Sequence, residues 1–331
     1  MTVDSNDAQL LYQKGLKELG QKNYVAALTS FQKAAEKKPQ NADVWFYIGV
    51  CYGNLGRYQD EIESLKQAIR IDPDLAYAHS NLGNAYGNIG RYQDEIESCK
   101  QAIRIDPDLA EAYFNLGGAY YKLRCYQDAI ESYKQVIKIK PDDAMAHLML
   151  GATYGDLGRS QDEIESYKQA IRINPDYTKA YYNLGIAYVK LGREQEGIES
   201  CKQAIKSNPD YSEAHFNLGV VYYNLGRSQE AIESYKQAIR IKPDYAEAHT
   251  NLGVAYDKLG RHQDAIEVYK QAIRIKPDNT VTHFCLGLTY LQVGDKSSAL
   301  EEYKILKNLD TKLTNPLFNQ LANGLFKQIY K

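Results

Sequence analysis

The chain has 331 residues, of which 44% are hydrophobic and 25% are charged, and its formal net charge is −2. Acidic and basic residues are interspersed along it, so neither a clustered basic face for nucleic acid nor an acidic disordered tail is expected. Apolar runs are too short for a membrane span, and the first residues lack the features of a signal peptide. Five cysteines without metal-type spacing predict reduced thiols in a cytoplasmic protein.

A proline recurs every 34 residues and divides the chain into repeats. The series is Pro39, Pro73, Pro107, Pro141, Pro175, Pro209, Pro243 and Pro277. With this proline at position 32, nine tandem repeats run over residues 8–41, 42–75, 76–109, 110–143, 144–177, 178–211, 212–245, 246–279 and 280–313. We expect an N-terminal tail at residues 1–7 and a C-terminal capping helix at residues 314–331.

Each repeat predicts two amphipathic helices joined by a turn, as residues 246–279 illustrate. Leu252 and Tyr256 are four residues apart, on one stripe of a first helix, and Gly260 is a typical stop residue after it. Pro277 cannot continue the second helix, and Asp278 is placed to cap the next one. Because one such pair cannot bury both of its apolar stripes, stacked pairs are expected to form an all-α solenoid.

These residues carry the signature of a known repeat, W-x2-L-G-x2-Y followed by A-x3-F, A and P. In the second repeat its positions are Trp45, Ile48, Gly49, Tyr52, Glu61, Leu65, Ala68 and Pro73. The chain therefore resembles the tetratricopeptide repeat (TPR) family from residue 8 to about residue 313. The resemblance implies an all-α, right-handed superhelix whose concave groove is lined by the first helix of each repeat and binds a protein or peptide.

Catalytic, metal-binding and cofactor-binding signatures are not found in the sequence, so we expect a protein that is not an enzyme. Histidine recurs at position 4, but equivalent residues on neighbouring helices lie too far apart to share a metal ion. We predict that these imidazoles pack between helices, with protonation below about pH 6 loosening the stack as an alternative. Cys99 and Cys201 are expected in the core, and Cys125 is expected to be exposed at a turn.

Asparagine recurs at position 6, in the interior of the first helix, where helix propensity does not explain it. Its members are Asn81, Asn115, Asn183, Asn217 and Asn251. This row resembles the asparagine ladder in the TPR superhelix of O-linked N-acetylglucosamine transferases, which implies amides that bind the backbone of an extended peptide. The alternative is that asparagine here is only the repeat consensus.

Methionine interrupts this row in the fifth repeat, where Met145 and Met149 predict an apolar pocket in the groove. Aromatic and basic side chains at other groove positions could hold a partner's side chains. They are Phe114, Tyr121, Lys122, Lys179, Tyr182, Lys190, Phe216, Tyr223 and Lys258.

Glutamate replaces the usual alanine at position 20 in three repeats, as Glu61, Glu95 and Glu163. The same repeats have glycine at position 12, as Gly53, Gly87 and Gly155. We predict that each glycine leaves a slot through which the glutamate reaches the groove, because an unpaired charge is not stable in a core. This would make the N-terminal half of the groove acidic.

These features together predict a non-catalytic scaffold or adaptor that binds a partner peptide or protein in the groove. We expect no cofactor, no metal, no nucleic acid and no membrane. Two alternatives stay open: a module that recruits substrates for a transferase or another enzyme, and a self-assembling scaffold, which would make the protein a homo-oligomer.

Overall fold

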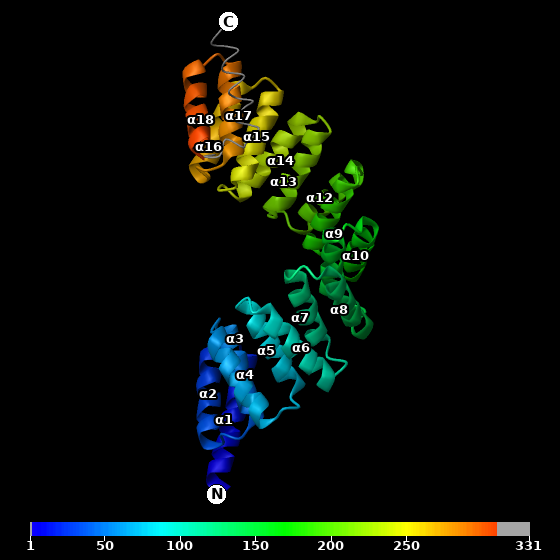
Figure 1. Ribbon diagram of the computed structural model, residues 1–331, viewed down its shortest axis with the longest axis vertical. Helices are drawn as coiled ribbons and strands as arrows, with labels where there is room; N and C mark the ends of the chain where they lie inside the picture. The colour runs from blue at the N-terminus through cyan, green and yellow to red at the C-terminus, as the bar shows by residue number, and fades with distance from the viewer. Residues whose placement is uncertain (1, 310–331) are drawn as a thin grey trace. The chain divides into compact units, whose positions relative to one another are not determined.

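A computed structural model describes the backbone of residues 2–309 and the side chains of residues 6–309. This part of the chain contains eighteen α-helices and no β-strand (Figure 1). Consecutive helices pair and stack on their neighbours, so the predicted all-α solenoid of helix pairs is confirmed. The chain divides into two compact units, with the boundary between Ile173 and Asn174.

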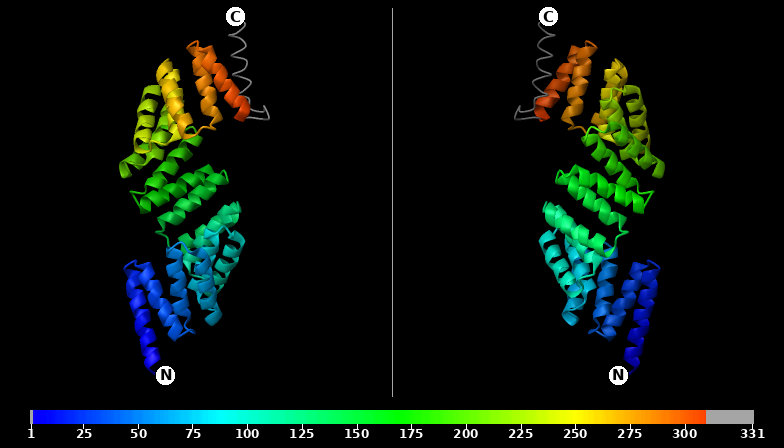
Figure 2. Two further views of the ribbon diagram at one scale, coloured as in Figure 1. Left: turned by 90° about the vertical axis from the view of Figure 1, so that its left-hand side faces the viewer. Right: turned by 90° about the vertical axis from the view of Figure 1, so that its right-hand side faces the viewer.

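The first unit holds five helix pairs, each with an odd-numbered first helix and an even-numbered second helix (Figure 2). They are α1 (Thr2–Gly20), α2 (Tyr24–Lys37), α3 (Ala42–Asn54), α4 (Tyr58–Ile71), α5 (Ala76–Asn88), α6 (Tyr92–Ile105), α7 (Ala110–Lys122), α8 (Tyr126–Ile139), α9 (Ala144–Asp156) and α10 (Ser160–Ile173). Each first helix from α3 onward packs on the second helix of the pair before it.

The second unit continues the same pattern with four helix pairs in its described part. They are α11 (Thr178–Lys190), α12 (Glu194–Ser207), α13 (Ser212–Asn224), α14 (Ser228–Ile241), α15 (Ala246–Lys258), α16 (His262–Ile275), α17 (Thr280–Gln292) and α18 (Lys296–Leu309). The largest apolar cluster of this unit runs from Ile198 to Leu306 and joins several pairs.

The two ends of the chain differ from the expectation in one respect. Residues 1–7 were expected to form a tail, but α1 begins at Thr2. The division into nine repeats bounded as above stays a prediction. The capping helix expected at residues 314–331 lies outside the described residues.

The turns inside the pairs need a left-handed backbone conformation. Gly260 has φ +72°, as a stop residue after α15 should, because glycine adopts this conformation without a steric penalty. Lys22 and Arg124 adopt it with φ of 59° and 62° although they carry a Cβ atom. The cap predicted at Asp278 is wrong: Asn279 caps α17, because its Oδ1 accepts hydrogen bonds from the backbone N–H groups of the first turn.

A tryptophan or histidine ring at position 4 links several first helices to the turn before them. Trp45 donates its ring N–H to the carbonyl oxygen of Pro39 at 2.8 Å. A histidine ring nitrogen makes the same bond elsewhere, in the pairs His79–Pro73, His215–Pro209, His249–Pro243 and His283–Pro277, at 2.9 to 3.0 Å. The rings therefore do more than pack: each satisfies a backbone acceptor between two repeats.

Candidate binding surfaces

The predicted site residues lie on the odd-numbered helices, on a surface that we call the first-helix face. In the first unit it is formed by α3, α5, α7 and α9, and in the second unit by α11, α13 and α15. The two units are described separately below. Each carries at least one pocket on this face.

A polar pocket of about 240 Å³ lies between α3 and α5 and is called the Glu61 pocket. Its lining residues are Val50, Gly53, Asn54, Glu61, Asn81, Asn84 and Asn88. Glu61 comes from α4 and is only 5% exposed. A Cβ atom on Gly53 would lie 2.6 Å from its Oε1 atom, so the missing side chain makes room for the carboxyl group. The slot predicted from the sequence is therefore confirmed for Glu61.

The carboxyl group of Glu61 is incompletely satisfied. Its Oε2 atom is buried and makes no hydrogen bond to any described residue. Burial raises the pKa of Glu61 to about 7, because the charged form loses its hydration without gaining a partner. A buried carboxyl oxygen without a hydrogen bond is stabilised by a ligand that donates one to it.

Two further carboxyl groups follow the same pattern in the first unit. Glu95 lies against Gly87 and Glu163 lies against Gly155, and both glutamates are buried. Burial also raises the pKa of Glu95 to about 7. Because burial favours their neutral form, Glu61 and Glu95 contribute less negative charge to this surface than exposed carboxyl groups would.

The asparagines of position 6 are half-buried on the first-helix face: Asn81, Asn115, Asn183, Asn217 and Asn251. Asn81 lines the Glu61 pocket, and Asn115 lies 3.5 Å from the hydroxyl of Ser80. The Nδ2 atom of Asn217 is buried and makes no hydrogen bond within the described part of the chain. At Asn217 the fold therefore leaves one buried amide donor without a partner among the described residues.

The methionines of the fifth repeat lie at different depths. Met145 is 45% exposed and lines a pocket of about 270 Å³ together with Phe114 and Asn115. Lys140 and Glu111 form an ion pair of 2.7 Å at this pocket, so its lining is mixed rather than purely apolar. Met149 does not line it and packs instead against the cluster of Ile130, Tyr133 and Leu150.

One predicted aromatic residue of the first unit already has a partner. The hydroxyl of Tyr121 donates a 2.5 Å hydrogen bond to Asp156 Oδ2, on the next first helix. This bond and burial raise the pKa of Tyr121 to about 12. Lys122 beside it is exposed. In this pair the lysine is therefore the side chain more accessible to a ligand.

The second unit has an apolar pocket of about 190 Å³ that Asn217 lines with Lys190, Val189 and Val220. Lys190 and Lys179 are both exposed. The polar ends of Asn217 and Lys190 make this pocket the counterpart of the Glu61 pocket, with donors in place of an acceptor.

Aromatic residues of the second unit mostly pack on one another. The ring of Tyr182 meets that of Tyr211 at 5.3 Å, and Phe216 meets Tyr245 at 5.0 Å. The ammonium group of Lys258 lies 4.6 Å from the ring of Tyr223. These contacts hold the side chains in place.

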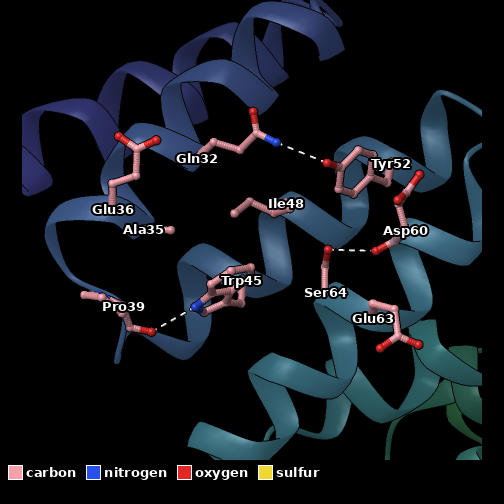
Figure 3. A pocket seen from close by; sticks show the side chains of 10 residues that line it. All are labelled: Gln32, Ala35, Glu36, Pro39, Trp45, Ile48, Tyr52, Asp60, Glu63 and Ser64. Atoms are coloured by element: carbon pink, nitrogen blue, oxygen red, sulfur yellow. Dashed lines mark hydrogen bonds between the residues drawn. The ribbon is translucent and has the colours of Figure 1, made fainter.

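The largest of the pockets described here was not predicted from the sequence, and it involves the second helices α2 and α4 of the first unit. We call it the Trp45 pocket; its volume is about 630 Å³ (Figure 3). It lies between α2 and α4, with α3 as its floor, and is lined by Gln32, Ala35, Glu36, Pro39, Trp45, Ile48, Tyr52, Asp60, Glu63 and Ser64. The available signal was the small Ala35, at a position where repeats two to eight have isoleucine.

Comparison with known families identifies the repeat. Models of the tetratricopeptide repeat match residues 30–63, 54–90 and 89–123. The model described as the cilia and flagella-associated protein 70 C-terminal domain, also built of such repeats, matches residues 107–311, more than half of the chain. The chain belongs to this family of TPR domains. The resemblance to TPR proteins drawn from the sequence is thereby confirmed.

Individual relatives of this TPR chain are distant. Superkiller protein 3 of Schizosaccharomyces pombe is 33% identical over 60 residues, which are 18% of this chain and only 4% of that protein. Among solved structures, the Cut9–Hcn1 hetero-tetramer of APC/C aligns with a TM-score of 0.56 and 16% identity, over 96% of this chain and 76% of that one. This likeness supports the fold.

Two shorter structures align with parts of the TPR chain. MamA is 33% identical over 49% of this chain and 95% of its own, with a TM-score of 0.46. YrrB, described as a TPR protein with an unusual peptide-binding site, is 24% identical over 56% of this chain and 96% of its own, with a TM-score of 0.47.

The described residues were also compared with the requirements of a membrane-spanning helix and of a metal site. None of the described helices has the length and apolar character needed to cross a bilayer. Within the described residues, no group of three or more histidine, cysteine or acidic side chains is arranged to hold a metal ion. Cys99 and Cys201 are buried, and Cys125 is exposed, as predicted.

Proposed function

We propose that this TPR chain is a non-catalytic adaptor that binds an extended segment of a partner protein on its first-helix face. The Glu61 pocket is the observation that carries this proposal. It presents a buried carboxyl oxygen without a partner, surrounded by the amides of Asn81, Asn84 and Asn88. Backbone N–H and C=O groups of an extended peptide complement such a surface, because each amide offers both donors and an acceptor.

Packing alone does not account for the Glu61 pocket. In the fourth and seventh repeats, position 20 is alanine and position 12 is tyrosine, in the pairs Ala129–Tyr121 and Ala231–Tyr223. Both alanines are fully buried, so the helix pair closes well without a glutamate. A buried carboxyl group costs stability when it has no partner. Glu61, whose buried Oε2 atom has no hydrogen-bond partner within the described residues, therefore supports a role in binding.

The second unit supports the same role with the opposite polarity. Asn217 carries a buried donor without a partner, beside the exposed Lys190. A peptide carbonyl or a carboxylate would satisfy both groups. We propose a cytoplasmic site of action, which the free thiols of the five cysteines support.

Affinity capture with matched variants tests this function. Wild-type protein, Asn81→Ala, Asn217→Ala and a control variant are immobilised, and bound proteins are compared by quantitative mass spectrometry. The control is Glu97→Gln, an exposed residue of the second helix α6. We expect the asparagine variants, but not the control, to lose the same partners, and peptide scans of those partners to give one extended segment. An unchanged partner set in both asparagine variants would refute the proposal.

A sedimentation experiment on the purified chain separates an adaptor from a self-assembling scaffold. A monomer at micromolar concentration is the expected result. Concentration-dependent assembly that Asn81→Ala and Asn217→Ala leave unchanged would favour the scaffold instead.

A further inference from the structure

The Trp45 pocket exists because the first repeat differs from the others at three positions of its second helix. Positions 25, 28 and 29 are Gln32, Ala35 and Glu36 there. In repeats two to eight, position 25 is always lysine, position 28 is always isoleucine, and position 29 is always arginine or lysine. The first repeat has thus lost bulk at one position and two positive charges at the others.

The lysine of position 25 has a defined place in later repeats. Its ammonium group lies over the position-11 tyrosine of the next repeat, at 5.8 to 6.0 Å from the ring centroid. This occurs in the pairs Lys66–Tyr86, Lys100–Tyr120, Lys236–Tyr256 and Lys270–Tyr290. The electron-rich face of a tyrosine attracts a cation at this range. A positive group therefore belongs in this groove wherever the chain supplies one.

The first repeat supplies no such cation from position 25. Gln32 is neutral and donates a 3.1 Å hydrogen bond to the hydroxyl of Tyr52 instead (Figure 3). The ninth repeat, in contrast, keeps a lysine, Lys304, at position 25. The pocket also gains the ring of Trp45, the only tryptophan of the chain.

Acidic side chains surround the open space. Figure 3 shows Glu36 on α2 and Glu63 on α4 at opposite sides of the pocket, with Trp45 and Ile48 between them. Asp60 is paired with Arg57 at 2.8 Å, and Glu63 lies 3.7 Å from Lys66. Glu36, where later repeats carry a cation, is exposed and is not in an ion pair within the described residues. Relative to its sister grooves, the pocket has lost two positive charges and gained one negative charge.

We propose that the Trp45 pocket binds a short basic segment of a partner protein, with a lysine or arginine side chain in the place that the chain's own lysine occupies in later repeats. The guanidinium of Arg57 already lies 4.5 Å from the ring centroid of Tyr52. The ring of Trp45 and the remaining face of Tyr52 receive the cationic side chain, and Glu36 and Glu63 attract the segment as a whole. The indole N–H does not take part, because it already donates to Pro39. At about 630 Å³ the pocket has room for more than one residue of the segment.

The fluorescence of Trp45 reports on this site directly, because it is the only tryptophan. Acetylated and amidated tetralysine, tetra-arginine and tetraglutamate are titrated against the full chain. We expect the basic peptides, and not tetraglutamate, to change the emission, with affinity falling as salt concentration rises.

A variant with the later repeats' residues tests the assignment. Gln32→Lys, Ala35→Ile and Glu36→Arg together restore the lysine, isoleucine and arginine found in α4, α6, α10, α14 and α16, so the helix should form normally. Binding of tetralysine, followed by isothermal titration calorimetry, is expected to weaken at least tenfold. Equal binding by wild type and variant would overturn the proposal.

The reciprocal variant should create a second pocket. Lys66→Gln, Ile69→Ala, Arg70→Glu and His79→Trp together give the next groove the residues of the Trp45 pocket. We expect the number of tetralysine molecules bound per chain to rise from one to two. An unchanged number would show that these positions do not define the site, and would overturn the proposal.

Two other results would also overturn it. One is the absence of tetralysine and tetra-arginine binding by wild type at millimolar peptide. The other is a dimer in sedimentation that the restoring variant dissolves, which would make a second copy of this chain the occupant. The Asn81→Ala variant must leave tetralysine binding unchanged, so this site can fail or stand independently of the first-helix face.

Discussion

The raised pKa of Glu61 leads to a quantitative prediction for the variant Glu61→Gln. The amide has nearly the same shape as the carboxyl group but never ionises. In the wild type, burial moves the pKa from 4.5 to about 7 in the folded state. Folded protein therefore holds this proton more tightly than unfolded protein does, so the free energy of unfolding falls as pH rises from about 4.5 to 7 and levels off above that range.

The size of the effect follows from the shift. One pKa unit corresponds to about 1.4 kcal/mol, and part of the loss is already present at pH 5, where the unfolded carboxyl group is mostly ionised. Between pH 5 and pH 8.5 the wild type should therefore lose about 2 to 3 kcal/mol of unfolding free energy relative to Glu61→Gln. The carboxyl group is only 5% exposed, so solvent screening reduces this value little.

Urea denaturation of both proteins at five pH values between 5 and 8.5 measures this difference. Glu63→Gln is the matched control, because Glu63 lies on the same helix with a side chain that is 65% exposed. Its unfolding free energy should stay within about 0.5 kcal/mol of the wild type at every pH. A difference between Glu61→Gln and wild type that does not change with pH would refute the reasoning, since Glu61 would then be an ordinary solvated carboxyl group.

Three further predictions concern packing, backbone and charge. Gly53→Ala should destabilise the fold by about 1 to 3 kcal/mol, because the new Cβ atom would meet the carboxyl group of Glu61, and the added change Glu61→Ala should recover most of that loss in the same urea assay. Arg124→Gly should stabilise the fold by about 0.5 to 1 kcal/mol, because φ of 62° suits glycine; a lower urea midpoint would contradict this. His283 lies in a 2.6 Å contact with Glu302, and although burial alone would lower its pKa, that contact and the backbone bond raise it. The variant His283→Gln should therefore cost about 1.5 to 3 kcal/mol at pH 5.5 and less at pH 8, and equal losses at both pH values would argue against a charged pair.

The fold could be predicted from the sequence because successive repeats carry the same pattern of apolar, glycine and proline positions. Regular proline spacing and paired apolar stripes are enough to predict the all-α solenoid. The Glu61 slot was predictable for a related reason: Gly53 and Glu61 change together, against a background of repeats that have neither. Positions at which one repeat differs from the others are therefore as useful for prediction as the positions that all repeats share.

Other features depended on distances that the repeat pattern does not contain. The hydrogen bond from Tyr121 to Asp156 joins two different first helices, and neither residue belongs to the repeat signature. Met149 carries the same apolar side chain as Met145, but it lies one turn further along α9 and packs into the core. The cap of α17 is Asn279 rather than Asp278, because a difference of one residue decides which side chain faces the free N–H groups.

The sequence left open, as an alternative to simple packing, that protonation of the position-4 histidines loosens the stack at low pH. The structure separates these residues. Burial lowers the pKa of His147, whose protonation therefore opposes folding as pH falls, whereas the pKa of His283 is raised and its protonation favours folding. The two residues have opposite effects on stability, so the summed response to pH is smaller than a simple count of histidines suggests.

The hydrogen bond from the position-4 ring to the preceding proline carbonyl has a consequence for how the array tolerates sequence change. Trp45 and His79 differ greatly in size, yet their ring nitrogens lie 2.8 Å and 2.9 Å from the carbonyl oxygens of Pro39 and Pro73, the equivalent prolines before them. These two junctions therefore share one donor position, while the rest of the ring differs. In a designed array, tryptophan and histidine could therefore be exchanged at this position to change the local surface. Each new repeat would keep its hydrogen bond to the proline carbonyl group of the repeat before it.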